Sequence, residues 1–127
     1  MAEESKRLMI VEDERPLIEA IEAKLKIEGF QTVTARSVEG AIGLLKDGVR
    51  IDAIWLDHYL LGKENGLDFV SKLKEHDKWK TIPIFVVSNT ASHDKVTHYL
   101  HLGVNKYYIK AEHRLEDIIK DIEAALK

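Results

Sequence analysis

The stretch Ile54-Trp55-Leu56-Asp57-His58-Tyr59 (IWLDHY) places three large apolar residues directly before one carboxylate. A short continuous apolar run indicates a strand that is buried on both faces of a sheet, as the strands of parallel sheets are. The carboxylate that follows the run has two interpretations. Asp57 is either a turn residue that ends the strand or a charged group held at the mouth of a pocket.

Other segments of the chain resemble the 53–56 strand, and they alternate with helical patterns. Runs that predict strands lie at residues 8–11, 30–35, 53–56, 82–87 and 107–109. Apolar residues at helical spacing predict helices over residues 17–25, 38–45, 67–73, 96–102 and 115–126. This alternation with short connections predicts an α/β fold. We expect a single flavodoxin-like, doubly wound (βα)5 domain with a five-stranded parallel sheet in the order 2-1-3-4-5.

Composition narrows the class of protein. The chain has 127 residues, of which 45% are hydrophobic and 32% charged, a balance typical of one globular domain. Nineteen Lys and Arg against 22 Asp and Glu give a net charge of -3, which argues against nucleic acid as a partner. The absence of cysteine excludes disulfides, and no apolar run approaches the ~20 residues that span a membrane. We expect residues 1–127 to be one cytoplasmic domain without an output domain.

Polar residues follow four of the predicted strands. They are residues 12–14 (EDE), Asp57, residues 88–90 (SNT) and Lys110. Each could be an ordinary surface or turn residue by itself. Because ligands of doubly wound sheets bind beyond the carboxyl ends of the strands, we expect these groups to share one site.

The chemistry of these groups favours phosphoryl transfer. Asp13 and Asp57 would repel each other at close range, and a divalent cation removes that conflict. Oxygen ligands alone select a hard ion, so the expected cofactor is Mg²⁺. A carboxylate such as Asp57 can attack phosphorus to give an aspartyl phosphate, while Lys110 neutralises charge and Ser88 donates a hydrogen bond.

Four stretches carry a resemblance to a known family over essentially the whole chain. They are VEDE at 11–14, WLDHYLLGKENGLDF at 55–69, VVSNT at 86–90 and GVNKYYIK at 103–110. With these motifs in this order, the sequence resembles a response-regulator receiver domain (CheY-like) of two-component signal transduction.

The resemblance implies a role for each site residue. Asp57 would be the phosphoacceptor, with Lys110 and Ser88 assisting phosphoryl transfer. Ser88 and Tyr107 would form the switch. The implied ligands of Mg²⁺ are Glu12, Asp13, Asp57 and the backbone carbonyl of Tyr59.

The resemblance also implies partners. A histidine kinase or a histidine phosphotransfer protein would donate the phosphoryl group from a phosphohistidine. A downstream protein would bind the face made by the fourth helix, the fifth strand and the fifth helix, with Tyr99, Lys106 and Tyr108 as candidate contacts. The domain would be a monomer or a weak homodimer. It would not be an enzyme beyond its own phosphorylation and slow autodephosphorylation.

The sequence departs from the family pattern at three places. Ala111 stands where receivers commonly have a proline in a cis linkage, so we expect a trans peptide bond after Lys110. Asn89 replaces a small residue and could obstruct the phosphoryl group or hydrogen-bond to it. The loop after Asp57 lacks the usual proline and reaches Gly66 with about one extra residue.

Two alternative functions remain open. A pseudo-receiver that binds partners without being phosphorylated is favoured by Asn89 and the missing proline. A haloacid-dehalogenase-type phosphatase also forms an aspartyl phosphate with Mg²⁺. That family generally has a second acid two residues after the nucleophile, where this chain has Tyr59.

Several histidines and tryptophans are interpreted as structural or surface residues. We expect the side chain of His58 to pack on a helix or lie at the rim, because neighbouring residues of a strand face opposite sides. His98 and His101 are expected on a solvated helix face. Trp55 and Trp79 are expected to pack in the core and at its edge.

Overall fold

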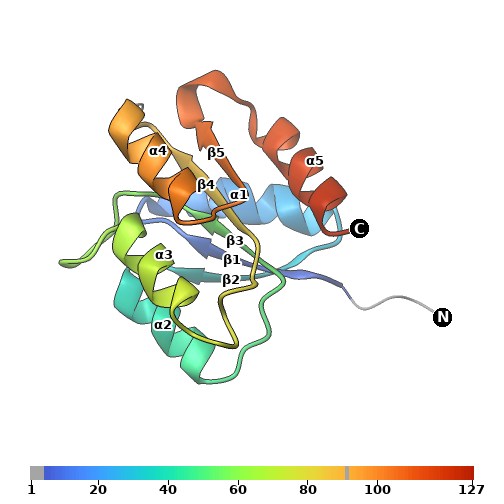
Figure 1. Cartoon of the computed structure of the whole chain (residues 1–127). Helices are drawn as coiled ribbons and strands as arrows, with labels where there is room; N and C mark the ends of the chain where they lie inside the picture. The colour runs from blue at the N-terminus through green and yellow to red at the C-terminus, as the bar shows by residue number, and fades with distance from the viewer. Residues whose placement is uncertain (1–4, 91) are drawn as a thin grey trace.

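The computed structural model describes residues 5–90 and 92–127, so the predicted 1–127 domain extends beyond the described residues. Five parallel strands form one sheet in the order β2-β1-β3-β4-β5, which confirms the predicted class and strand order (Figure 1). The strands are β1 (Arg7–Val11), β2 (Gln31–Ala35), β3 (Ala53–Leu56), β4 (Ile84–Ser88) and β5 (Lys106–Ile109).

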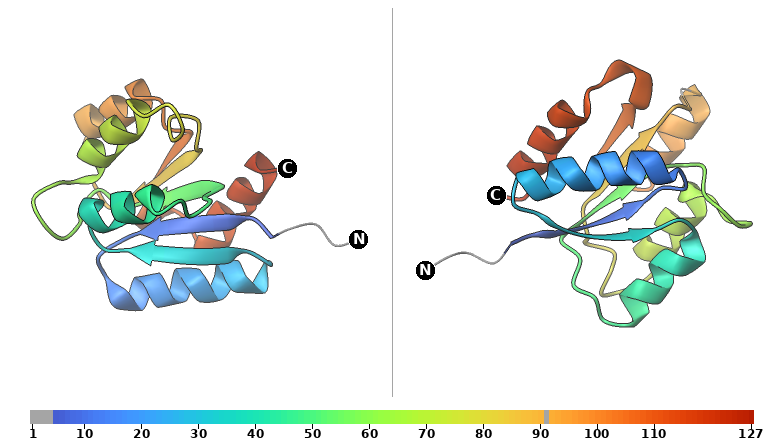
Figure 2. Two further views of the ribbon diagram at one scale, coloured as in Figure 1. Left: turned by 90° about the horizontal axis from the view of Figure 1, so that it is seen from below. Right: turned by 180° about the vertical axis from the view of Figure 1, so that it is seen from behind.

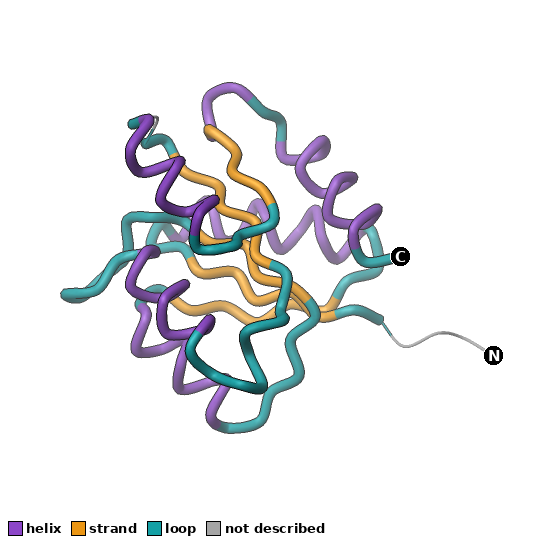
Figure 3. Tube along the Cα trace, viewed as in Figure 1, coloured by secondary structure: helices purple, strands orange, loops and turns teal. Residues whose placement is uncertain are grey.

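Helices cover both faces of the sheet. They are α1 (Arg15–Ile27), α2 (Val38–Lys46), α3 (Gly66–Lys74), α4 (His93–His101) and α5 (Leu115–Ala125), with a short 3-10 helix η1 (Lys110–Glu112) after β5. Seen from behind, α1 crosses in front of the strands (Figure 2), and the strands lie between the two helix layers (Figure 3). One core cluster lies beneath α1 and α5, and the other beneath α2, α3 and α4.

Local signals set the helix ends. Pro16 lies in the first turn of α1, where its missing N–H costs nothing. The Ser37 hydroxyl accepts a hydrogen bond from the Gly40 N–H and caps the start of α2. Asn65 and Asp68 form a capping box at the start of α3. Gly29 follows α1 with φ of 89°, a left-handed conformation that glycine adopts readily.

Two predicted strands begin later than expected. Phe30 precedes β2 because its N–H donates to the Leu25 carbonyl and completes the C-terminal turn of α1. Pro83 has no N–H to give to the ladder, and β4 starts at Ile84. The Pro83 carbonyl still accepts from the Ile54 N–H at 2.9 Å.

The buried tryptophan is Trp55, which lies in the core beneath α1 and α5 with none of its surface exposed. Within residues 5–90 and 92–127, its indole nitrogen is the one buried side-chain N or O atom without a hydrogen-bond partner. Trp79 is half-buried and stacks on His76 with ring centroids 3.6 Å apart. Both tryptophans therefore pack as predicted.

Strand order creates one special position at the carboxyl edge of the sheet. From β1, the chain adds β2 on one side of the sheet, and then returns to add β3, β4 and β5 on the other side. The strand order therefore reverses between the neighbours β1 and β3. Val11 and Leu56, the last residues of these strands, are paired. The polar residues that follow them therefore lie side by side.

The described residues contain no helix that could span a membrane. No helix there has both the length and the apolar character required to cross a bilayer.

Candidate functional site

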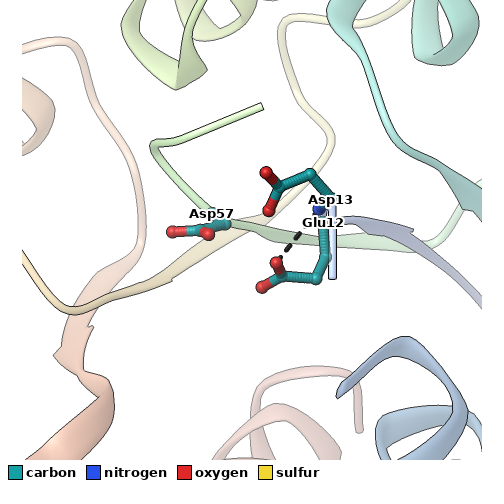
Figure 4. A group of neighbouring side chains, drawn as sticks. All are labelled: Glu12, Asp13 and Asp57. Carbon is teal, nitrogen blue, oxygen red and sulfur yellow. Dashed lines mark hydrogen bonds between the residues drawn. The ribbon is translucent and has the colours of Figure 1, made fainter. Parts of the chain in front are cut away.

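Three carboxylates meet beyond the ends of β1 and β3. Glu12 and Asp13 follow β1, Asp57 follows β3, and oxygens from all three lie within 4.8 Å of one another. Figure 4 shows the three side chains gathered around one space. The Asp57 N–H donates to the Val11 carbonyl at 2.9 Å, which extends the β1–β3 ladder into the site. The predicted convergence of these acids is therefore observed.

Glu12 is fully buried and its carboxylate organises the acidic loop. Its Oε2 accepts hydrogen bonds from the backbone N–H groups of Asp13 (3.0 Å) and Glu14 (3.1 Å). Burial raises the pKa of Glu12 to about 7, and the charge of Asp57 adds to the rise, while the hydrogen bond from Lys110 opposes it. Ionisation is therefore disfavoured at Glu12, a different residue from the Asp13 and Asp57 pair whose mutual repulsion the sequence predicts.

Lys110 connects the acids from the other side. It follows β5 directly, and its ammonium nitrogen lies 2.8 Å from Glu12 Oε1 and 3.2 Å from Asp57 Oδ2. Burial acts to lower the pKa of Lys110, but the hydrogen bonds and charges of the two carboxylates outweigh it and raise the pKa above its usual value. The ammonium therefore stays charged inside the site.

Asp57 is buried and its carboxylate is held at both oxygens. Oδ1 accepts a hydrogen bond from the backbone N–H of His58 at 2.7 Å, and Oδ2 faces Lys110. A carboxylate held between a backbone donor and an ammonium is fixed in orientation. The first interpretation of this residue, a simple turn, does not account for these contacts.

Ser88 and Tyr107 lie beside the acids on the next two strands. Ser88 is buried, ends β4 and pairs with Ile109, the residue before Lys110. Its hydroxyl oxygen is 3.4 Å from the Thr90 N–H, and the Tyr107 hydroxyl donates to the Thr90 carbonyl at 2.6 Å. Tyr107 is half-buried, with its ring 5.6 Å from that of Tyr99. Tyr107 therefore already points inward in this structure.

The rim of the site holds the remaining predicted residues. Tyr59 is 53% exposed, and the Lys95 ammonium lies 5.5 Å from the centroid of its ring. Asn89 is exposed at the end of β4. The described residues contain no cis peptide bond, so the bond after Lys110 is trans, as predicted for Ala111. The chain continues from there into η1.

Sequence reasoning missed Arg36, the residue that follows β2. Its Nε and Nη2 atoms donate to the backbone carbonyl of Asp13 at 3.0 and 2.7 Å. This guanidinium fixes the loop that carries Glu12 and Asp13. The signal was present in the sequence, because a cation directly after a predicted strand belongs to the same edge as the acids.

Two candidate partner contacts are wrong. Tyr99 and Tyr108 have 0% and 1% of their surface exposed, since Tyr99 packs from α4 into the core and Tyr108 packs beneath α5. The Tyr108 hydroxyl is satisfied by Asp121 at 2.7 Å. Lys106 is exposed as expected and pairs with the same carboxylate at 3.0 Å.

The histidine predictions are confirmed. His98 and His101 are exposed on α4, and His58 packs against that helix. In residues 5–90 and 92–127, the acids of the site are the one group of three or more His, Asp or Glu with metal-binding spacing.

The acidic cluster fits a hard divalent cation. All side-chain donors are oxygens, which suit Mg²⁺ better than softer ions. One ammonium contacts two of the three carboxylates, those of Glu12 and Asp57. Burial, together with the negative charge of Asp57, raises the pKa of Glu12. Fold and site together define a class: a doubly wound α/β domain with an acidic pocket at its switch point and a lysine that reaches this pocket from the end of β5.

Comparison with known proteins identifies the family. The family model of the response regulator receiver domain matches residues 8–123. The chain belongs to this family, the receiver domains of two-component response regulators, and is therefore a signalling module.

Curated relatives agree with this assignment. The chain is 31% identical over 104 residues to the transcriptional regulatory protein CpxR of Escherichia coli, covering 82% of this chain and 42% of CpxR. It is 29% identical over 106 residues to the phosphate regulon transcriptional regulatory protein PhoB of the same organism, covering 84% of this chain and 45% of PhoB. The chain thus spans less than half the length of these relatives.

A solved structure gives the same result in three dimensions. The phosphorylated cyanobacterial phytochrome response regulator RcpA superposes with a TM-score of 0.85 at 28% identity. The match covers 97% of this chain and 94% of RcpA.

Proposed function

We propose that the domain is a phosphorylation switch in which Asp57 accepts a phosphoryl group from a phosphohistidine of a histidine kinase or histidine phosphotransfer protein. The observation that carries the proposal is the placement of the Asp57 carboxylate, 3.2 Å from the Lys110 ammonium and beside the acidic pair. Membership of the receiver family and the similarity to RcpA, a phosphorylated protein, support it.

The transfer step needs little more than positioning and charge. An oxygen of Asp57 forms a bond to phosphorus while the bond between phosphorus and the donor imidazole nitrogen breaks. The leaving electron pair returns to that nitrogen. Lys110 stabilises the negative charge on the phosphoryl oxygens, and Ser88 orients one of them by hydrogen bonding.

The same proposal assigns the metal ligands. Glu12, Asp13, Asp57 and the backbone carbonyl of Tyr59 would hold Mg²⁺. Bound Mg²⁺ would supply positive charge that offsets the charge of the acids and of the phosphoryl oxygens. Arg36 supports this arrangement, because its bonds to the Asp13 carbonyl fix the loop that carries two of the ligands.

Phosphorylation would place a group with a charge of about -1.5 to -2 next to Lys110 and Ser88, in place of the single negative charge of the Asp57 carboxylate. Ser88 would move toward the new oxygens, and the inward position of Tyr107 would be stabilised. The proposed output face consists of α4, β5 and α5, with Lys106 as the remaining candidate contact for a downstream protein. A cytoplasmic location, a monomer or weak homodimer, and no activity beyond slow autodephosphorylation belong to the same proposal.

The decisive experiment is to incubate the protein with a small phosphodonor and Mg²⁺ and to weigh the intact chain. We expect the addition of one phosphoryl group, which Asp57→Asn prevents. Asp77→Asn, at a carboxylate that is 98% exposed, is the matched control and should be modified like the wild type.

The alternatives give different results in the same experiment. A pseudo-receiver would gain no phosphoryl group and consume no donor. A phosphatase of the haloacid dehalogenase type would turn over the donor rapidly. Either outcome would overturn the proposed switch.

A further inference from the structure

The two residues that follow Asp57 both contact α4. His58 is buried, and its Nδ1 lies 2.6 Å from the Tyr99 hydroxyl. The Tyr59 ring stands edge-on to the His58 ring at 4.9 Å and receives the Lys95 ammonium over its face. We call this group, His58, Tyr59, Lys95 and Tyr99, the loop–helix clasp.

The helical partners of the clasp lie on one face of α4. Lys95 and Tyr99 are four residues apart, and such residues are neighbours on a helix surface. His58 and Tyr99 are both buried, so the hydrogen bond between them is shielded from solvent. If one partner of such a buried pair is lost, no water can replace it, and the remaining polar group stays without a hydrogen bond at a cost in free energy.

Gly66 shows how closely the clasp is fitted. A Cβ at this position would lie 2.3 Å from the Tyr99 hydroxyl and 3.1 Å from the His58 Cα. The Gly66 N–H also donates to the His58 carbonyl at 2.9 Å. The hydroxyl of Tyr99 therefore occupies space that a glycine leaves free at the start of α3, and α4 is joined to the loop at that point.

The same loop orients the phosphoacceptor. The backbone N–H of His58 donates to Asp57 Oδ1 at 2.7 Å, while the side chain of His58 is anchored by Tyr99. The conformation of His58 thus determines two contacts at once. Its backbone N–H donates to the Asp57 carboxylate, and its side chain bonds to Tyr99 on α4.

We propose that His58 and Tyr99 are positioning residues that hold Asp57 in its reactive orientation and tie the phosphoacceptor loop to α4. A change at the Asp57 carboxylate then reaches α4 directly, by a path separate from Ser88 and Tyr107. The transmission of phosphorylation along this path rests on the proposed function; the tie between loop and helix does not.

The first test is amide hydrogen exchange of the whole, unphosphorylated chain. Tyr99→Phe and His58→Leu each remove the hydrogen bond and keep an apolar side chain of similar size. We expect exchange about fivefold faster in residues 57–65 and 93–102, with other segments unchanged. His58→Asn, whose amide can replace Nδ1, should restore slow exchange. Tyr108→Phe, which removes the bond to Asp121, is the matched control.

The second test measures phosphorylation by a small donor. We expect the maximal rate to fall about tenfold in Tyr99→Phe and His58→Leu, while the donor concentration for half-maximal rate stays the same. His58→Asn and Tyr108→Phe should retain the wild-type rate. A merely structural role would not produce a loss that the asparagine rescues.

The outcomes separate this proposal from the proposed function. If the wild type is not phosphorylated, the function fails, and the exchange experiment still decides whether loop and helix are tied. Wild-type exchange at 93–102 in both Tyr99→Phe and His58→Leu would overturn the proposal. Equal acceleration in every segment would overturn it as well, because it would indicate a general loss of stability.

Discussion

The Lys110 ammonium lies 2.8 Å from the carboxylate of Glu12, a side chain with no exposed surface. The pair joins the end of β5 to the end of β1, elements separated by β3 and β4 in the sheet. Lys110 therefore has a structural role in the free domain, in addition to its proposed role toward the phosphoryl group.

Replacing Lys110 with alanine should destabilise the free domain. The substitution leaves Glu12 and Asp57 without their cation, and we expect the free energy of unfolding to fall by about 3 kcal/mol. Urea unfolding in the presence of a chelator measures this loss, and added Mg²⁺ should reduce it because a bound cation replaces the missing charge. Lys106→Ala, which breaks an exposed pair, should cost less than about 1 kcal/mol. An equal loss in both variants would contradict the role given to Lys110.

The raised pKa of Glu12 predicts how the metal-free domain responds to pH. The pKa is about 7 in the folded state against 4.5 for an ordinary glutamate, so between these values the folded state binds more protons than the unfolded state. Stability must then fall as pH rises from 4.5 to 7 and level off above 7. The loss of unfolding free energy due to the ionisation of Glu12 is about 3 kcal/mol between pH 4.5 and the plateau above pH 7.

Glu12→Gln provides the comparison for this pH dependence. The unfolding free energies of the wild type and the variant are measured with a chelator across pH 4.5–8. As pH rises from 4.5 to 7, the wild type should lose stability relative to the variant, because glutamine does not titrate. A constant difference would show that Glu12 titrates normally in the folded state.

Gly66 should not tolerate a side chain. Alanine there would bring a Cβ to 2.3 Å from the Tyr99 hydroxyl and 2.9 Å from the Asp57 carbonyl, and we expect a loss of about 2–3 kcal/mol in unfolding free energy. Gly43→Ala is the matched control, because it lies in α2 with no atom within 4 Å of the new Cβ. The control should stabilise the domain by up to about 1 kcal/mol. Thermal unfolding of both variants measures the contrast.

Tyr107→Ala should separate phosphorylation from output. The variant loses the hydrogen bond to the Thr90 carbonyl and the ring contact with Tyr99, but Asp57 and Lys110 are untouched. We expect the mass increase from a phosphodonor to persist, while phosphorylation-induced changes in the NMR spectrum of α4 and β5 become smaller. Undiminished spectral changes would remove Tyr107 from the switch.

Much of the fold and of the site could be predicted from the sequence. Apolar runs, helical spacing and strand-end residues are local features, and the switch-point rule then brings Glu12, Asp13, Asp57 and Lys110 together. Arg36 obeys the same rule, but its role depends on a contact with a backbone carbonyl, which no residue pattern encodes.

The contacts of the tyrosines could not be predicted in the same way. A tyrosine is polar at one atom and apolar elsewhere, so its burial depends on whether that atom finds a partner. Tyr99 finds His58, 41 residues earlier, and Tyr108 finds Asp121. Both partners lie on other elements, and their alignment is a property of the packed structure.

The burial of Trp55 gives the domain an intrinsic optical reporter. This indole is shielded from solvent and lies on β3, two residues before Asp57. The second tryptophan, Trp79, stacks on His76 away from the acids, near the opposite edge of the sheet. Emission from a Trp79→Phe protein would therefore come from a single tryptophan on the strand that leads into Asp57, and ligand occupancy could be followed in real time without any attached dye.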